Sequence, residues 1–176
     1  MPSGTTNGPR PSRQERYDMT NRPEKGDNAP KISIPVSDEE SVNLGAPAGA
    51  AHVVYFYPRD NTPGCTTESI DFSTLLPKFQ ALGVEIIGVS KDSLKSHNNF
   101  KNKKELTVTL ASDENHDACE QFGVWVEKNM YGKKYMGIER STFLVLKDGT
   151  LAELWRKVKV KGHAEAVFEA TRQILA

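Results

Sequence analysis

The sequence predicts an α/β domain with a mixed central β-sheet and helices on both faces, and three observations support this prediction. Strand-like apolar runs alternate with helical stretches along the chain, which is typical of parallel β-α-β units. A hairpin signal near the C-terminus then adds antiparallel strands. The composition of the 176 residues, 37% hydrophobic and 26% charged, fits one globular domain preceded by a tail.

The N-terminal segment, residues 1–28, is rich in Pro, Gly, Ser, Asn and charged side chains. Such a composition cannot bury enough apolar surface to offset the entropy lost on ordering. We therefore expect a flexible tail at 1–28 and one domain at 29–176. The tail lacks the apolar core of a secretory signal peptide. Its Arg and Ser residues leave open whether it is a short targeting sequence or a plain extension.

Five apolar segments are predicted β-strands. Residues 32–34 alternate between apolar and polar, and residues 42–44 are a candidate partner strand. The run AHVVYFY at 51–57 is continuous, β-branched and aromatic, which favours a strand covered on both faces. Residues 84–90 (VEIIGVS) and 106–112 (LTVTLAS) are further strands.

Three stretches between these strands favour helices. Apolar side chains recur at spacings of three and four from residue 72 to 82, and we expect Pro77 to end or kink that helix. Residues 93–104 are polar and fit an exposed helix. Residues 114–123 fit a short helix that stops at Gly123.

The C-terminal third contains the hairpin signal. Residues 125–139 have no clean period and are predicted to form a loop. Two apolar runs, 140–146 and 150–157, flank an Asp-Gly pair, which predicts a β-hairpin. Residues 163–175 form an amphipathic helical pattern. This order of elements is compatible with a thioredoxin-like fold.

Composition narrows the class of function. The two cysteines, Cys65 and Cys119, form no CxxC pair, which argues against a disulfide scaffold and a Cys-rich zinc site. So few thiols fit a reducing compartment, and we expect the cytoplasm. The 23 basic residues balance 23 acidic ones, so no nucleic-acid partner is indicated. No apolar run approaches the roughly 18 residues of a membrane span.

Cys65 lies where the chain leaves a predicted buried strand and enters a helix. Pro63 suits the first turn of a helix, and Gly64 allows close approach of the backbone. The free N–H groups and the positive dipole end at a helix N-terminus favour an anion. A thiolate is such an anion and is the nucleophilic form of cysteine. The alternative is that Cys65 is a small apolar core residue, as buried cysteines usually are.

The segment YFYPRDNTPGCTTE resembles the active-site segment of peroxiredoxins. That pattern is Pro, three residues, Thr or Ser, two residues and Cys, which here gives Pro58, Thr62 and Cys65. The form TPGCTTE is similar to the bacterioferritin comigratory protein, or peroxiredoxin Q, branch. The segments GDNAPKISIP, SDENHDACEQFGVW and YGKKYMGIERSTFLVLKDG are similar as well, so the resemblance covers about residues 26–175.

This resemblance implies a thiol-dependent peroxidase that reduces hydrogen peroxide and organic hydroperoxides through a sulfenic acid on Cys65. The Thr62 hydroxyl and the Cys65 N–H would be donors to the reacting oxygens, and Arg140 would stabilise the thiolate and hold the peroxide. Pro58 would shield the sulfur, and Glu68 would orient Arg140. From the residues alone, Thr62 is equally a helix cap, Glu68 a dipole partner and Arg140 a surface side chain.

The sequence departs from the family pattern at the second, resolving cysteine. Members of the branch carry it five residues after the first or in the next helix, where this chain has Ile70 and Lys101. We favour a structural role for Cys119 and expect a one-cysteine enzyme, monomeric or weakly associating. Thioredoxin, glutaredoxin or a small thiol such as glutathione would then recycle it, with no cofactor and no metal.

Two other functions stay open at this point. A peroxide sensor would perform the same first step but pass its oxidation to a partner protein. A thioredoxin-fold oxidoreductase would instead form a Cys65–Cys119 disulfide, although such proteins normally need a CxxC pair.

Overall fold

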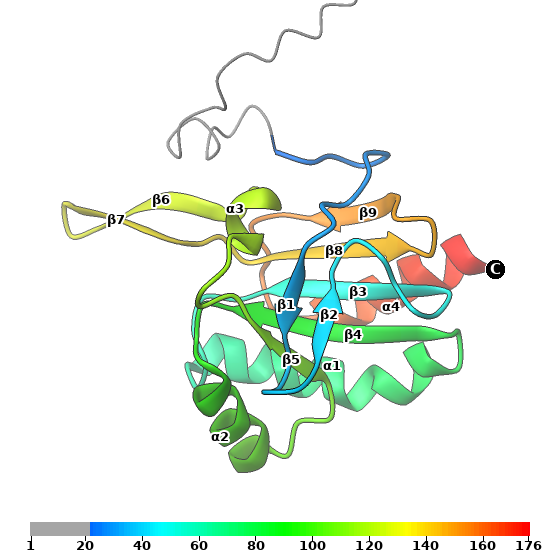
Figure 1. Ribbon diagram of the computed structural model, residues 1–176, viewed down its shortest axis with the longest axis horizontal. Helices are drawn as coiled ribbons and strands as arrows, with labels where there is room; N and C mark the ends of the chain where they lie inside the picture. The colour runs from blue at the N-terminus through cyan, green and yellow to red at the C-terminus, as the bar shows by residue number, and fades with distance from the viewer. Residues whose placement is uncertain (1–21) are drawn as a thin grey trace, which may run out of the picture.

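The computed structural model describes residues 22–176 (Figure 1). Its strands are β1 (Ser33–Pro35), β2 (Ser41–Asn43), β3 (Ala51–Phe56), β4 (Val84–Ser90), β5 (Thr109–Ser112), β6 (Trp125–Met130), β7 (Lys133–Ile138), β8 (Ser141–Leu146) and β9 (Leu151–Trp155). Its helices are α1 (Pro63–Gln80), α2 (Leu94–Lys104), α3 (Ala118–Gln121) and α4 (His163–Leu175).

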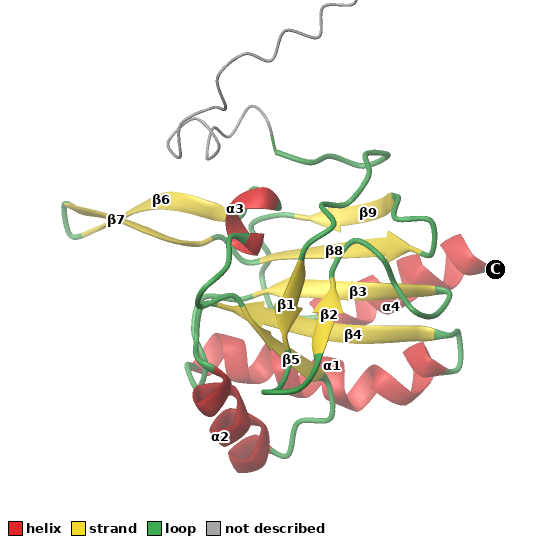
Figure 2. Ribbon diagram, viewed as in Figure 1, coloured by secondary structure: helices red, strands yellow, loops and turns green. Residues whose placement is uncertain are grey.

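The central sheet has five strands in the order β5-β4-β3-β8-β9. Strands β3, β4 and β5 are parallel and are connected through α1 and α2, while β8 and β9 are antiparallel to their neighbours. The Asp-Gly pair at 148–149 lies in the β8–β9 turn, as the sequence predicted. The predicted mixed sheet and thioredoxin-like α/β class are confirmed, and Figure 2 shows the sheet between its helices.

Two apolar clusters cover the two faces of this sheet. Because side chains alternate along a strand, Val53 and Tyr55 of β3 enter one cluster while Val54 and Phe56 enter the other. The first cluster lies under α1 and α4, and the second lies under the β1–β2 hairpin and α3. The sheet therefore separates the protein into two interior regions.

The predicted loop at 125–139 is wrong, because this segment forms the hairpin of β6 and β7. Its turn residues Tyr131 and Gly132 have φ values of 53° and 79°, the positive values of a two-residue hairpin turn. Figure 1 shows this hairpin extending away from the central sheet. Most of its side chains are exposed on both faces, so the strands lack the alternating apolar pattern that reveals a half-buried strand.

Helix α1 continues through Pro77 instead of ending there. A proline inside a helix leaves the carbonyl four residues earlier without its usual donor. Here that carbonyl belongs to Ser73, and the Thr107 hydroxyl donates to it at 3.3 Å. The segment that precedes β5 thus supplies the missing hydrogen bond.

Two other predicted elements are shorter than expected. Helix α3 begins at Ala118, because the Asp113 carboxylate accepts the N–H groups of Ala118 and Cys119 at 2.9 and 2.8 Å and holds the preceding residues in a turn. Strand β5 begins at Thr109, although Leu106 and Val108 are buried in the core.

The first described residues lie against the domain. Leu151 of β9 exchanges backbone hydrogen bonds with Gly26 and Asp27 at 2.9 and 2.8 Å, and Asn28 forms a β-bridge with Thr150. The sequence placed these residues in the tail; the rest of that predicted tail, 1–21, lies outside the described residues. Across 22–176, no helix has both the length and the apolar character needed to cross a membrane.

Candidate active site

Cys65 lies in the first turn of α1, at the carboxyl end of the central strand β3. Thr62 is the N-cap residue by its extended backbone, and the Thr66 N–H donates to the Thr62 carbonyl at 2.8 Å. The N–H groups of Gly64 and Cys65 precede this first helical bond, so they have no acceptor within the helix. The Cys65 side chain is only 1% exposed. Its sulfur is therefore held beside free backbone donors and away from bulk solvent.

A guanidinium group contacts this sulfur. Arg140, the residue before β8, donates from Nη2 to Cys65 Sγ at 3.3 Å. Burial alone would lower the pKa of Arg140, but Glu68 and Cys65 raise it, so the guanidinium stays charged. A Cβ atom on Gly64 would lie 3.2 Å from Arg140 Nη2. Glycine at position 64 thus leaves room for the guanidinium beside the sulfur.

Glu68 binds the other side of the same guanidinium. Arg140 Nη1 donates to Glu68 Oε1 at 2.6 Å, and the Glu68 side chain is 1% exposed. Burial raises the pKa of Glu68 to about 7, with Arg140 acting in the opposite direction. The second carboxylate oxygen, Oε2, is buried with no hydrogen-bond partner among the described residues. Arg140 is thus held between a sulfur and a carboxylate, both on α1.

The remaining two predicted site residues make other contacts. The Thr62 hydroxyl donates to the Arg59 carbonyl at 2.9 Å, and this bond closes the turn of residues 59–62. Among the described residues, the Thr62 side chain makes no cap hydrogen bond to α1. Pro58 is exposed in the segment that joins β3 to α1. The structure therefore brings together Cys65, Arg140 and Glu68.

Cys119 lies far from this cluster in the fold. Its side chain is fully buried in the second apolar cluster, whereas Cys65 belongs to the first, so the central sheet separates the two thiols. Burial raises the pKa of the Cys119 thiol well above its usual value, and Asp113 acts in the same direction. Both cysteines are free thiols. This separation disfavours the Cys65–Cys119 disulfide left open by the sequence.

The β6–β7 hairpin brings a second cation towards the site. Lys128 of β6 is half-buried, and burial together with the charge of Arg140 lowers its pKa, while Cys65 and Glu139 act in the opposite direction. The sequence placed this residue in a loop and gave no signal for its position.

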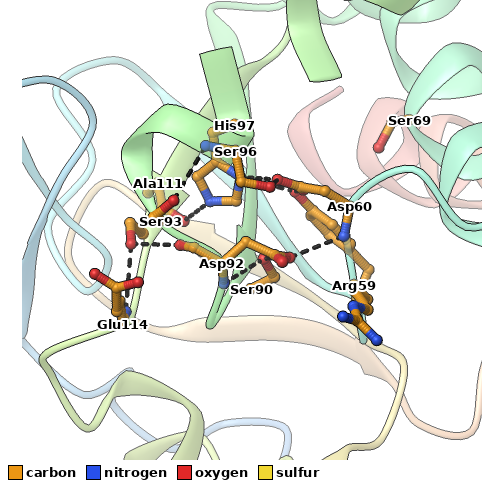
Figure 3. A network of polar contacts seen from close by, with 12 residues as sticks. Arg59, Asp60, Ser69, Ser90, Asp92, Ser93, Ser96, His97, Ala111 and Glu114 are labelled. Carbon is orange, nitrogen blue, oxygen red and sulfur yellow. Dashed lines mark hydrogen bonds and ion pairs between the residues drawn. The ribbon is translucent and has the colours of Figure 1, made fainter. Parts of the chain in front are cut away.

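The largest feature that the sequence missed is a polar network around the segment before Cys65 (Figure 3). Asp60, in that segment, is hydrogen-bonded to His97 and Ser96 of α2 at 2.8 Å each. The sequence treated His97 as a histidine without a motif. The only available signal was its position at the start of the helix after β4, because parallel strands end at one edge of the sheet.

The described residues contain no group of three His, Cys, Asp or Glu side chains that could hold a metal ion. His116 and Cys119 lie three residues apart in the sequence, but among the described residues no further His, Cys, Asp or Glu side chains complete a metal site with them.

Comparisons with known proteins agree with this geometry. The AhpC/TSA family matches residues 25–154. The peroxiredoxin Bcp of Xanthomonas campestris pv. campestris is 50% identical over 141 residues, which are 80% of this chain and 88% of that protein. The peroxiredoxin Bcp of Bacillus subtilis is 49% identical over 151 residues, which are 86% of this chain and 96% of that protein.

A solved structure is similar as well. It is that of the X. campestris bacterioferritin comigratory protein, described for its alkyl peroxide reduction activity. It has a TM-score of 0.77 and 48% identity, and the match covers 82% of this chain and 92% of that one.

Proposed function

Because this chain belongs to the AhpC/TSA family and is a peroxiredoxin, a thiol-dependent peroxidase, we propose that Cys65 is the residue that attacks the peroxide. The observation that carries this proposal is the contact of 3.3 Å between Arg140 Nη2 and Cys65 Sγ in the first turn of α1. A fixed positive charge and a helix N-terminus both favour the thiolate, which is the reactive form.

The proposed reaction is a displacement at oxygen. The thiolate attacks the terminal oxygen of the peroxide, an S–O bond forms and the O–O bond breaks. The attacked oxygen keeps its proton and becomes the hydroxyl of a Cys65 sulfenic acid, while the leaving hydroxide or alkoxide takes up a proton from solvent and gives water or an alcohol. Negative charge spreads from sulfur over two oxygens, and Arg140 with the free N–H groups of Gly64 and Cys65 lies where donors are needed.

Glu68 has a supporting role in this proposal. Its carboxylate fixes the direction of the Arg140 guanidinium through the bond of 2.6 Å, so that the other nitrogen faces sulfur. Thr62 keeps its proposed contact with the peroxide only if its hydroxyl turns from the Arg59 carbonyl. Pro58, which is exposed, keeps its proposed role of shielding the sulfur.

We further propose that an external thiol recycles the enzyme. The positions where the branch carries a resolving cysteine hold Ile70 and Lys101, and Cys119 lies on the other side of the sheet. The sulfenic acid must then react with a thioredoxin, a glutaredoxin or a small thiol. Organic hydroperoxides are proposed as substrates beside hydrogen peroxide, by similarity to the X. campestris protein. A monomer in the cytoplasm fits a single-chain site and two free thiols.

Peroxide consumption with a panel of these reductants, together with intact mass of the oxidised protein, tests the proposal. We expect Cys65→Ser to abolish turnover and Cys119→Ser to retain most of it. In proteins that keep Cys65, the mass of the oxidised form should increase by one oxygen, located on Cys65. Loss of turnover in Cys119→Ser together with a Cys65–Cys119 bond would contradict the one-cysteine mechanism. Rapid oxidation of Cys65 with slow turnover by every general reductant would favour a peroxide relay instead.

A further inference from the structure

Asp60 and His97 form a buried hydrogen-bonded pair beside the Cys65 segment, and the chemistry above does not use it (Figure 3). The Asp60 carboxylate accepts hydrogen bonds from the hydroxyls of Tyr57 at 2.5 Å and Ser96 at 2.8 Å, and from His97 Nδ1 at 2.8 Å. Burial alone would raise the pKa of Asp60, but these bonds, led by that of His97, lower it. The carboxylate is therefore ionised and fully bonded.

His97 makes a polar contact through each of its ring nitrogens. Nε2 lies 3.0 Å from the Ala111 carbonyl oxygen, which can only accept, and Nδ1 faces the ionised Asp60 carboxylate. The ring therefore connects three parts of the fold: helix α2, strand β5 and the segment between β3 and α1.

The backbone of the segment is held as well. The Asp60 N–H donates to Asp92 Oδ2 at 2.8 Å, and Ser90 Oγ donates to the same oxygen at 2.6 Å. The next residue, Asn61, has a φ of 64°, in the left-handed region that side chains rarely adopt. Such a conformation persists where the surrounding contacts impose it. Here those contacts are the hydrogen bonds made by Asp60, the residue before Asn61.

These contacts end where the reactive turn begins. Asp60 lies two residues before the N-cap Thr62 and five before Cys65, and no side chain caps the N-terminus of α1. The position of the first turn therefore depends on the segment before it. A buried hydrogen-bonded pair adds little net stability, because folding exchanges its bonds to water for bonds within the protein. The pair lies at the segment that joins β3 to α1. This location favours a role in fixing the conformation of the segment over a role in overall stability.

We propose that Asp60 and His97 are positioning residues that hold the 57–62 segment so that Cys65 Sγ faces Arg140 in the peroxide-reactive geometry. This inference rests on the proposed role of Cys65. A displacement at oxygen needs the sulfur, the peroxide and its donors in line, and errors of about 1 Å can slow such a step roughly 100-fold. The pair would act through the backbone, without touching the peroxide.

Two substitutions of His97 separate its bonds. Asparagine places its amide nitrogen near the position of Nδ1, so His97→Asn keeps a donor for Asp60. Glutamine places it near Nε2, so His97→Gln keeps the Ala111 bond and loses Asp60. The matched control is His52→Gln: His52 is also buried and bonds the Leu44 carbonyl from Nε2 at 2.8 Å, away from this segment.

The measurements are the rate constants of Cys65 oxidation by hydrogen peroxide and of Cys65 alkylation by iodoacetamide, both followed by mass. We expect His97→Gln to slow oxidation by about tenfold or more, with His97→Asn within about threefold of the wild type. Alkylation needs the thiolate but no peroxide aligned between the sulfur and Arg140, so in His97→Gln it should slow much less than oxidation does, or become faster as the 1%-exposed sulfur becomes accessible. Tyr57→Phe, which removes one bond to Asp60, should slow oxidation to a smaller extent.

Oxidation of His97→Gln at the wild-type rate would overturn the inference. It would also be overturned if His52→Gln lost the same amount of Tm and its Cys65 oxidation slowed as much as that of His97→Gln. Should His97→Gln not fold, the rate of Tyr57→Phe decides alone, and an unchanged rate refutes the positioning role. A wild-type Cys65 that peroxide leaves unmodified would refute the proposed function itself, which keeps the two failures distinct.

Discussion

Replacing Arg140 with methionine tests the contact on which the proposed chemistry depends. Methionine keeps much of the side-chain length but removes the charge and both donors, so Cys65 loses the contact of 3.3 Å and Glu68 loses the ion pair of 2.6 Å. We expect a large loss in the rate of Cys65 oxidation, because the attacking sulfur and the developing oxygen charge lose the guanidinium that contacts them.

The size of the effect follows from this geometry. Two unit charges 3.3 Å apart attract by about 5 kcal/mol at an effective dielectric constant of about 20. Only the part that grows in the transition state changes the rate, and loss of one such donor in enzymes costs about 10²–10³-fold, or about 3–4 kcal/mol. We therefore expect oxidation to slow by about 10²–10³-fold in Arg140→Met.

Stability must be separated from rate in this experiment. Arg140→Met leaves Glu68 buried without its partner and removes the cation that lowers its pKa, so the group protonates near neutral pH and the loss of stability stays below the about 3–5 kcal/mol of an unpaired buried charge. The double variant Arg140→Met/Glu68→Gln removes the ionisable group and should recover the part of the stability that is lost at higher pH. Stopped-flow oxidation by hydrogen peroxide and urea unfolding give the two quantities. A single variant oxidised within threefold of the wild-type rate, or a double variant with its rate restored, would refute the assignment of Arg140.

Two further predictions follow from neighbouring groups. Gly64→Ala places a Cβ 3.2 Å from Arg140 Nη2, so oxidation should slow by about tenfold while the fold is kept; wild-type kinetics would contradict this contact. Burial, with Arg140 acting in the same direction, lowers the pKa of His163 to about 4 from 6.5, so its neutral form stabilises the protein above pH 6.5 by up to about 3 kcal/mol, which is lost as the pH falls through 4. Urea unfolding of His163→Gln should lack this part of the acid slope, and an identical slope would exclude His163 as its source.

The sequence predicted the central architecture because its strands are almost entirely buried. The runs around Val53 and Ile86 are mostly apolar, with Glu85 the one exposed residue of β3 and β4, and the Asp-Gly pair at 148–149 is a strong hairpin signal. The β6–β7 hairpin escaped prediction because Tyr131-Gly132 is a weaker turn signal than Asn-Gly or Asp-Gly and because its strands have no buried face.

In the candidate site, too, local sequence indicated some features, whereas contacts between distant residues could not be predicted from it. The local segment around Cys65 indicated a helix N-terminus from Pro63 and Gly64 alone. Arg140 and His97 could not be derived from local pattern, because Arg140 meets the sulfur across 75 positions and His97 meets Asp60 across 37. The resemblance supplied Arg140, whereas only the folded chain shows that His97 reaches the segment before the reactive turn.

The placement of the two thiols on opposite faces of the sheet has a consequence for stoichiometry. Under the proposed one-cysteine mechanism, one protein molecule would consume one oxidant molecule before an external thiol had to reduce it. If outside thiols are scarce, a second oxidant molecule competes for the same sulfur and converts it to the sulfinic acid, which thiols do not reverse. The lifetime of the enzyme under oxidative load would then be set by the supply of reductant in its surroundings.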